Sequence, residues 1–140
     1  MNILILCTGN SARSQMAQGF LQSFDSNLTV RSAGTEPADR VNPHAIEAMK
    51  EVGVDISDHS PKMVDKYLDG QWDYVITVCD HANETCPAFL GKVRHRIHMG
   101  FEDPAAASGT PKEVLNKFRE VRDRIEQEFK RLYETNISTG

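Results

Sequence analysis

Short apolar runs alternate with helical patterns along this chain, and this alternation limits its fold more than any other feature. The apolar runs cover residues 3–6, 28–30, 74–78 and, more weakly, 93–98. The run at 3–6 is unbroken, as in a strand buried on both faces, and β-branched residues in the others suit a pleated surface. Strands alternating with helices predict a small doubly wound α/β domain with three layers and a four-stranded parallel sheet.

The helices are expected at about residues 14–24, 43–52 and 62–68, with a long helix near the C-terminus. In the long helix an apolar residue recurs every three or four positions between Val114 and Leu132, as in a helix packed on a sheet. Charges of both signs flank this stripe and indicate a solvated face. The 140 residues contain no linker or repeat, so we expect one domain over 1–140, with a frayed tail at about 135–140.

The charge balance argues against nucleic acid as the main partner. The chain has 16 Lys and Arg against 20 Asp and Glu, a net charge of −4, and neither half is a basic arm. We also expect neither a signal peptide nor a membrane span, because the first residues carry no charged segment or long apolar stretch, and we expect a cytoplasmic protein. Three cysteines are too few for a disulfide scaffold.

The loop after the first strand has the features of an oxyanion site. Its backbone amides, together with the N-terminus of the following helix, can converge on an anion. Gly9 permits close approach, Asn10 tolerates a left-handed conformation, and the fork of Arg13 matches two oxygens of a tetrahedral anion. The predicted substrate-binding residues are Thr8, Gly9, Asn10, Ser11, Ala12, Arg13 and Ser14.

Cys7, at the base of this loop, is the candidate nucleophile. Amide dipoles and Arg13 favour a thiolate, so we expect the pKa of Cys7 to fall below the usual value of about 8.5. An inert buried cysteine is the plainer interpretation of the same residue. The position of the pattern Cys-x5-Arg between strand and helix favours the nucleophile.

A proton donor for a departing oxygen is the other requirement of such a reaction, and Asp103 is the candidate. It precedes Pro104 in a loop between the last strand and the last helix, on the side where ligands bind in such folds. The Asp-Pro pair is equally typical of a turn, and the proton could come from the substrate instead. The sequence does not choose between these interpretations.

The other two cysteines differ in position. Cys79 follows the third strand, which places it on the same rim of the sheet as Cys7, and Cys86 comes seven residues later. In a regular helix the two would lie about 10.5 Å apart along the axis, so a bridge between them requires a rearrangement. Zinc is the competing interpretation, with His81, His95 and His98 nearby. Their spacing fits no common structural zinc pattern, and we expect no metal.

Several segments together resemble the thioredoxin-coupled arsenate reductases, which have the low-molecular-weight protein tyrosine phosphatase fold. The resemblance covers nearly the whole chain. Its loop and Asp-Pro pair are shared with the phosphatases, so only the additional cysteine pair indicates reduction. The matching positions are 7–17, 32–34, 42–43, 55–57, 79, 86–87 and 100–105.

The resemblance implies a relay of three cysteines that turns arsenate into arsenite. Cys7 would attack arsenic while the loop and Arg13 hold the oxyanion and Asp103 assists the departing oxygen. Cys79 would then attack Cys7 and release arsenite, and Cys86 would take over the disulfide for reduction by thioredoxin or a similar dithiol protein. The electrons come from thiols, so the resemblance implies no further cofactor.

Two alternatives remain open from the sequence. One is a low-molecular-weight protein tyrosine phosphatase that uses Cys7, Arg13 and Asp103, although the alanine-rich run after Asp103 lacks the tyrosines of many such enzymes. The other is a non-catalytic arsenite or redox sensor, which would bind without turnover.

Two further expectations concern ions and assembly. Some relatives bind potassium beside the loop through carboxylates, whereas the corresponding positions here are Gln18 and Lys62. The lysine ammonium would stand in for the cation, so we expect no activation by potassium. The bland surface predicts a monomer.

Overall fold

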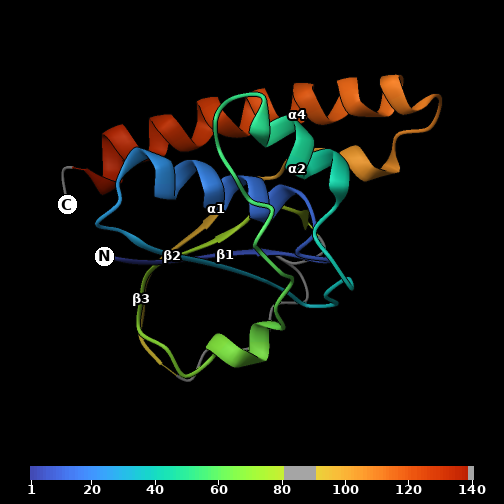
Figure 1. The fold of residues 1–140 in the computed structure, drawn as a ribbon. Helices are drawn as coiled ribbons and strands as arrows, with labels where there is room; N and C mark the ends of the chain where they lie inside the picture. Colours follow the sequence, from blue (N-terminus) through green and yellow to red (C-terminus); the bar gives the residue numbers. More distant parts are fainter. Residues whose placement is uncertain (81–90, 139–140) are drawn as a thin grey trace.

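The computed structural model describes residues 1–80 and 91–138 and contains a parallel sheet with helices packed against it (Figure 1). The four strands are β1 (Asn2–Cys7), β2 (Thr29–Gly34), β3 (Trp72–Thr77) and β4 (Val93–His98). Their spatial order is β2-β1-β3-β4, and each neighbouring pair is parallel. The predicted α/β fold is confirmed, and the direction in which strands are added reverses between β1 and β3. Ligands bind at such a reversal, outside the carboxyl ends of the strands.

The central strand β1 is buried on both faces, as its unbroken apolar run predicts. Ile3 and Ile5 belong to the larger core, to which α1 (Arg13–Phe24), α2 (Pro43–Lys50) and α4 (Pro111–Leu132) contribute. Leu4 and Leu6 point to the other face and pack in a smaller core. Figure 1 shows the three helices on one side of the sheet and the short η1 (Val64–Tyr67) on the other.

The prediction of a helix at 62–68 is wrong, because only the short 3-10 turn η1 forms there. Lys62 and Met63 are extended beside the end of β2: the Gly34 N–H donates to the Lys62 carbonyl at 2.8 Å, and Met63 forms a bridge with Gly34. Backbone groups used for this pairing are not available to a helix. This pairing holds the segment against the loop that follows β1.

The long helix α4 begins and packs as its sequence predicts. Thr110 and Glu113 form a capping box, Pro111 occupies the first turn, and the apolar stripe is buried. The frayed tail expected from about residue 135 is wrong up to residue 137. A π-helical turn, Tyr133–Ile137, continues α4, and Ile137 is buried in the larger core, which outweighs the polar composition of the segment.

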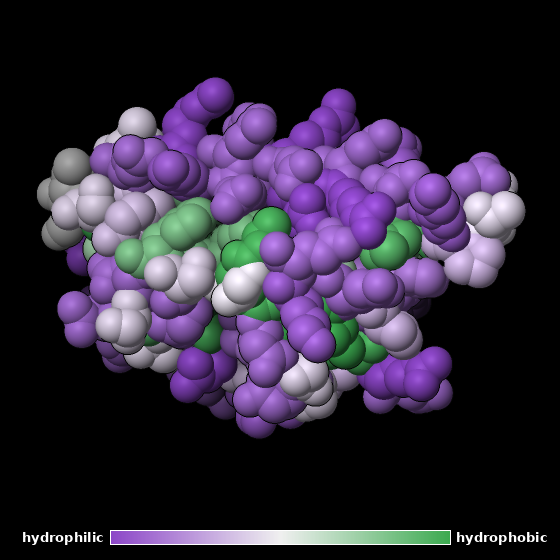
Figure 2. Space-filling model, turned by 45° about the horizontal axis from the view of Figure 1, so that its top comes forward, coloured by the Kyte–Doolittle hydropathy of each residue, from purple (hydrophilic) through white to green (hydrophobic). Residues whose placement is uncertain are grey.

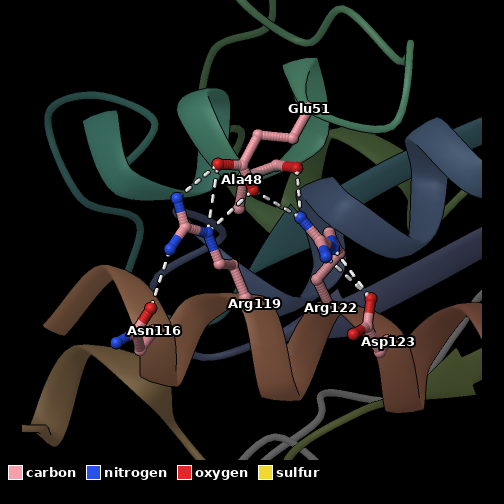
Figure 3. A network of polar contacts seen from close by, with 6 residues as sticks. All are labelled: Ala48, Glu51, Asn116, Arg119, Arg122 and Asp123. Carbon is pink, nitrogen blue, oxygen red and sulfur yellow. Dashed lines mark hydrogen bonds and ion pairs between the residues drawn. The ribbon is translucent and has the colours of Figure 1, made fainter. Parts of the chain in front are cut away.

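A polar cluster, which we call the α2–α4 clamp, joins the C-terminal end of α2 to α4 (Figure 3). Glu51 receives hydrogen bonds from the guanidinium groups of Arg119 and Arg122. Arg122 also donates to the Ala48 carbonyl at 2.8 Å and, through Nε, to Asp123 at 2.9 Å. The clamp therefore pairs a nearly buried arginine with partners on two helices.

The surface above these helices is mostly hydrophilic. Figure 2 shows polar side chains over most of this face, with smaller hydrophobic areas between them. This agrees with the solvated outer face predicted for the long helix. Within residues 1–80 and 91–138, every helix is too short or too polar to cross a membrane.

Candidate active site

The loop between β1 and α1 is held by the side chain of Asn10, which is buried and left-handed with φ of 50°. Its Nδ2 donates to the hydroxyl oxygens of Ser14 and Ser32 at 2.7 and 2.9 Å. Its Oδ1 accepts from the Gln15 side chain at 3.1 Å and from the Lys62 backbone N–H at 2.9 Å. The expected left-handed Asn10 is thus confirmed, and one side chain joins the loop, α1, β2 and the segment after α2.

The end of β2 supports the same loop through its backbone. A Cβ atom at Gly34 would lie 2.4 Å from the carbonyl oxygen of Thr8, so only glycine fits at this position. Beyond it, the N–H groups of Thr35 and Glu36 donate to the carbonyls of Cys7 and Thr8. These bonds are donated by residues beyond β2 and use carbonyl groups of the loop. They do not involve the backbone amides of the loop.

The start of α1 has the features of an anion site. Ala12 occupies the N-cap position, and no side chain in residues 1–80 or 91–138 caps the helix, so the positive end of the helix dipole faces the loop without a side-chain partner from these residues. The Arg13 guanidinium lies at the same point with its side chain 13% exposed. The buried Arg13 Nε has no hydrogen-bond partner among the described residues. Unpaired donors of this kind are costly unless a ligand uses them.

Arg13 also connects the loop to Asp103. One of its terminal nitrogens donates to the carbonyl of Phe101 at 3.0 Å, and the other lies 3.8 Å from the Asp103 carboxylate. Asp103 accepts from the N–H of Ala105 at 3.0 Å, so it is also the turn residue that the Asp-Pro pair indicates. Both interpretations of Asp103 are therefore compatible, because its half-exposed carboxylate caps the turn while facing the arginine.

Cys79 lies beside Cys7 at the rim of the sheet, as the parallel order predicts. The two thiols are buried, and the Cys79 side chain is hydrogen-bonded to Cys7. The sulfur of Cys79 also lies 3.2 Å from the hydroxyl oxygen of Thr8. Residues 71 positions apart in the sequence thus meet in the loop.

The protonation of Cys7 is opposite to the expectation. The hydrogen bond that the Cys7 thiol makes to Cys79 and burial raise the pKa of Cys7, whereas Arg13 and the backbone at Thr8 act to lower it and are outweighed. The sequence argument counted the arginine and the amides but not the second thiol or the burial. The surroundings of Cys7 thus favour the thiol over the thiolate.

The structure accordingly brings together Cys7, Arg13, Cys79 and Asp103 around the loop that contains the other predicted binding residues. Cys86 and His81 lie outside the described residues. Within the described part of the chain, no group of three His, Cys, Asp or Glu side chains is placed to hold a metal ion.

The positions proposed to replace a potassium site lie behind the loop. Gln18 accepts from the Ser32 hydroxyl at 2.6 Å, and the Lys62 ammonium donates to Ser60. Both residues line a polar pocket of about 150 Å³, together with Gln15 and His59. The ammonium is thus beside the Asn10 network, and its role in place of potassium stays a prediction.

Sequence reasoning missed some residues that hold the site. The side-chain oxygen of Gln15 is hydrogen-bonded to the His59 ring. The His98 ring is hydrogen-bonded to Thr77 and Asp80, which lie on either side of Cys79 in the sequence. The bonds of His98 could have been anticipated from position, because Thr77 and His98 end neighbouring parallel strands and Asp80 follows one of them.

Comparison with known proteins places this architecture in context. A family model described as low molecular weight phosphotyrosine protein phosphatase matches residues 2–138. An arsenate reductase of Halalkalibacterium halodurans is 46% identical over 134 residues, which cover 95% of each chain.

Two solved structures show the same fold. One, described as an arsenate reductase in the phosphate binding state, is 31% identical with a TM-score of 0.79, covering 95% of this chain and 96% of the other. A thioredoxin-dependent arsenate reductase of Corynebacterium glutamicum is 28% identical with a TM-score of 0.72, covering 99% of this chain and 62% of that one.

Proposed function

The chain belongs to the low molecular weight phosphotyrosine protein phosphatase family, and from this premise we propose that it reduces arsenate to arsenite with its own thiols. The observation that carries the proposal is the hydrogen-bonded pair of Cys7 and Cys79 at the oxyanion loop. Phosphate ester hydrolysis needs one nucleophile, whereas reduction by two electrons needs a second thiol within reach of the first.

Substrate capture depends on the loop and Arg13. The uncapped start of α1 and the unpaired Nε of Arg13 are donors for a tetrahedral oxyanion. A solved relative in the phosphate binding state supports an oxyanion in such a fold. The negative chain as a whole does not attract anions, so this local site does the work.

In the first chemical step the Cys7 sulfur bonds to arsenic and an oxygen leaves as water. The Cys7 thiol gives up its proton as its sulfur attacks, and this proton passes to the departing oxygen. Asp103, held beside Arg13, assists this transfer by orienting the departing oxygen or by relaying the proton. The arsenic stays pentavalent in this step.

In the second step the Cys79 sulfur attacks the Cys7 sulfur. The sulfur–arsenic bond breaks and its electron pair goes to arsenic, which leaves as trivalent arsenite and takes up the Cys79 proton. The two thiols are oxidised to a Cys7–Cys79 disulfide. The hydroxyl of Thr8, at 3.2 Å from the Cys79 sulfur, holds the attacking thiol toward Cys7.

In the third step Cys86 attacks Cys79, which frees Cys7 and forms a Cys79–Cys86 disulfide. Cys86 lies outside the described residues, so this step is supported by the sequence alone. We propose that thioredoxin or a similar dithiol protein reduces the final disulfide, in the cytoplasm, where thiols are kept reduced. The name of the Corynebacterium relative supports thioredoxin as the class of donor.

The decisive experiment measures arsenate-dependent NADPH oxidation with thioredoxin and thioredoxin reductase, beside hydrolysis of an aryl phosphate. We expect turnover in the first assay and at most weak hydrolysis in the second. Hydrolysis alone would make the protein a phosphatase that uses Cys7, Arg13 and Asp103. Stoichiometric arsenite binding without turnover in either assay would make it a sensor.

The relay is tested with Cys86→Ser. This variant is expected to stop after one turnover as a Cys7–Cys79 disulfide, detected by mass spectrometry of non-reduced peptides. Sustained turnover of this variant would refute the relay while leaving arsenate reduction intact.

A further inference from the structure

Three polar side chains form a chain of hydrogen bonds beside the two thiols. The Thr77 hydroxyl oxygen lies 2.8 Å from Nδ1 of His98, and Nε2 of His98 lies 2.8 Å from the Asp80 carboxylate. Because a carboxylate only accepts, Nε2 carries the hydrogen of the bond to Asp80, and Nδ1 is hydrogen-bonded to the Thr77 hydroxyl. Both ring nitrogens of His98 are therefore occupied.

The place of this chain in the fold is specific. Thr77 ends β3 and His98 ends the neighbouring strand β4, while Asp80 lies three residues beyond Thr77. The imidazole therefore bridges the two ends of a four-residue segment whose third residue is Cys79. Through His98, strand β4 is therefore hydrogen-bonded to both ends of this segment.

Backbone bonds join the first half of this segment to the residues that follow β4. The N–H groups of Met99 and Phe101 donate to the carbonyls of Thr77 and Val78. Beyond these bonds, the Asp80 carboxylate is 86% exposed, and its contact with His98 ties it to the sheet. His98 thus contacts the segment on each side of Cys79, in addition to the contacts that the Cys79 thiol makes with Cys7 and Thr8.

Gly100 provides the space for this contact. A Cβ atom at Gly100 would lie 3.2 Å from the Asp80 carboxylate and 3.4 Å from Nε2 of His98. Both distances are at or inside the range of close packing, so a larger residue would press on the pair. The loop that leads to Asp103 thus passes close to the His98–Asp80 bond at Gly100.

We propose that His98 is a positioning residue for the disulfide step, holding the turn of Cys79 so that its sulfur reaches Cys7. This rests on the proposed function and adds a residue that acts only on its second step. The His98 ring has no nitrogen left for the oxyanion. Capture of the anion by the loop and Arg13 is therefore independent of it.

The main test uses the full-length Cys86→Ser protein, in which the relay is expected to stop at Cys7–Cys79. A single turnover with arsenate is quenched at intervals, and the disulfide is followed by mass spectrometry. Adding His98→Ala is expected to slow its formation about tenfold, because one or two hydrogen bonds that orient the thiol are lost. Asp80→Ala is expected to slow it less, and Asp80→Asn, which keeps an acceptor oxygen, to restore most of the rate.

Two controls separate positioning from general damage. His95→Ala removes an imidazole from the same strand, where it stacks on Tyr74, and should leave the disulfide rate unchanged. Thr77→Val removes one hydroxyl with little change in shape, so it tests the chain even where His98→Ala fails to fold. The affinity for inorganic phosphate, measured by calorimetry, should be the same in all variants, since His98 does not act on anion capture.

The same disulfide can be formed without arsenate by oxidation with diamide, and His98→Ala should slow this reaction as well. If the Cys86→Ser parent forms the disulfide with diamide but not with arsenate, the proposed function fails, and the positioning role stands if His98→Ala slows the diamide reaction and falls if it does not. If His98→Ala changes neither the rate with diamide nor the rate with arsenate, the positioning role is overturned. An equal loss of phosphate affinity and disulfide rate would also overturn it, since His98 would then act on the whole site.

Discussion

Arg13 and Arg122 are both nearly buried, with side chains 13% and 10% exposed, yet their surroundings differ. In the α2–α4 clamp, Arg122 donates to Ala48, Glu51 and Asp123. In the candidate site, Arg13 has a buried Nε without a partner among the described residues. The first arrangement stabilises the fold, whereas the second keeps a donor available for a ligand.

The helix N-termini differ in the same way. Asn42 caps α2 and Thr110 caps α4 with side-chain hydrogen bonds, but α1 starts at Ala12 without such a cap. A missing cap costs about 1 kcal/mol in an ordinary helix. The one uncapped N-terminus among α1, α2 and α4 is the one at the proposed oxyanion site. Of these two arginines and three helix starts, the ones with incomplete pairing are those at the candidate site.

The largest expected effect is that of Arg13→Ala on activity. Losing the fork of an oxyanion donor should lower kcat/KM for arsenate by roughly 10²–10³-fold. The melting temperature without ligand should stay close to that of the wild type, because Arg13 is not fully paired. Phosphate should stabilise the wild type against heat but not the variant. Arg31→Ala, an exposed arginine on β2, is the control, and an equal loss of activity there would contradict the assignment.

Arg122→Ala should show the reverse pattern. It leaves the Ala48 carbonyl and the Glu51 carboxylate without their shared donor, so the free energy of unfolding should fall by about 2 kcal/mol. Denaturation by urea measures this loss, and kcat/KM should be nearly unchanged. Arg119→Ala, at the more exposed position of the same clamp, should cost less. A large loss of activity without loss of stability in Arg122→Ala would remove the distinction between the two regions.

A third test concerns the opposite pKa shifts in the two regions. Cys79→Ala is compared with its parent, which keeps Cys79, in the Cys86→Ser background. The alanine variant should have the lower pKa at Cys7, because it lacks the hydrogen bond that raises it most. Titration of the thiolate absorbance measures both values. Equal pKa values would show that burial alone sets the protonation of Cys7.

The smallest expected effect is that of pH on Glu51→Gln. Hydrogen bonds from Arg119 and Arg122 lower the pKa of Glu51 from 4.5 to about 2, so the folded protein binds this proton more weakly than the unfolded chain. The stabilisation by Glu51 is therefore complete above pH 4.5 and is lost as the pH falls toward 2. The variant should melt a few degrees lower at neutral pH, and the difference should shrink in acid. A difference independent of pH would assign the effect to packing.

Much of the fold and of the oxyanion loop could be predicted because the determining interactions are local. The apolar run of β1, the stripe of α4 and the left-handed Asn10 each depend on neighbouring residues in the chain. The helix expected at 62–68 failed because its first residues pair with Gly34, a contact that local propensity does not contain. The tail failed for the same reason, since Ile137 finds a place in a core built by distant elements.

The residues of the candidate site could be identified from the sequence, but their protonation and their hydrogen-bond partners could not. Residue order and periodicity suffice for strands, helices and the position of Cys7, Arg13 and Asp103 at one edge of a parallel sheet, because these follow from short-range geometry. The raised pKa of Cys7, the Asn10 network and the His98 bridge come from partners that are distant in the sequence: Cys79 for Cys7, Lys62 for Asn10 and Asp80 for His98. Hydrogen bonding and desolvation act only over a few ångströms, so they exist once the chain has placed these groups side by side.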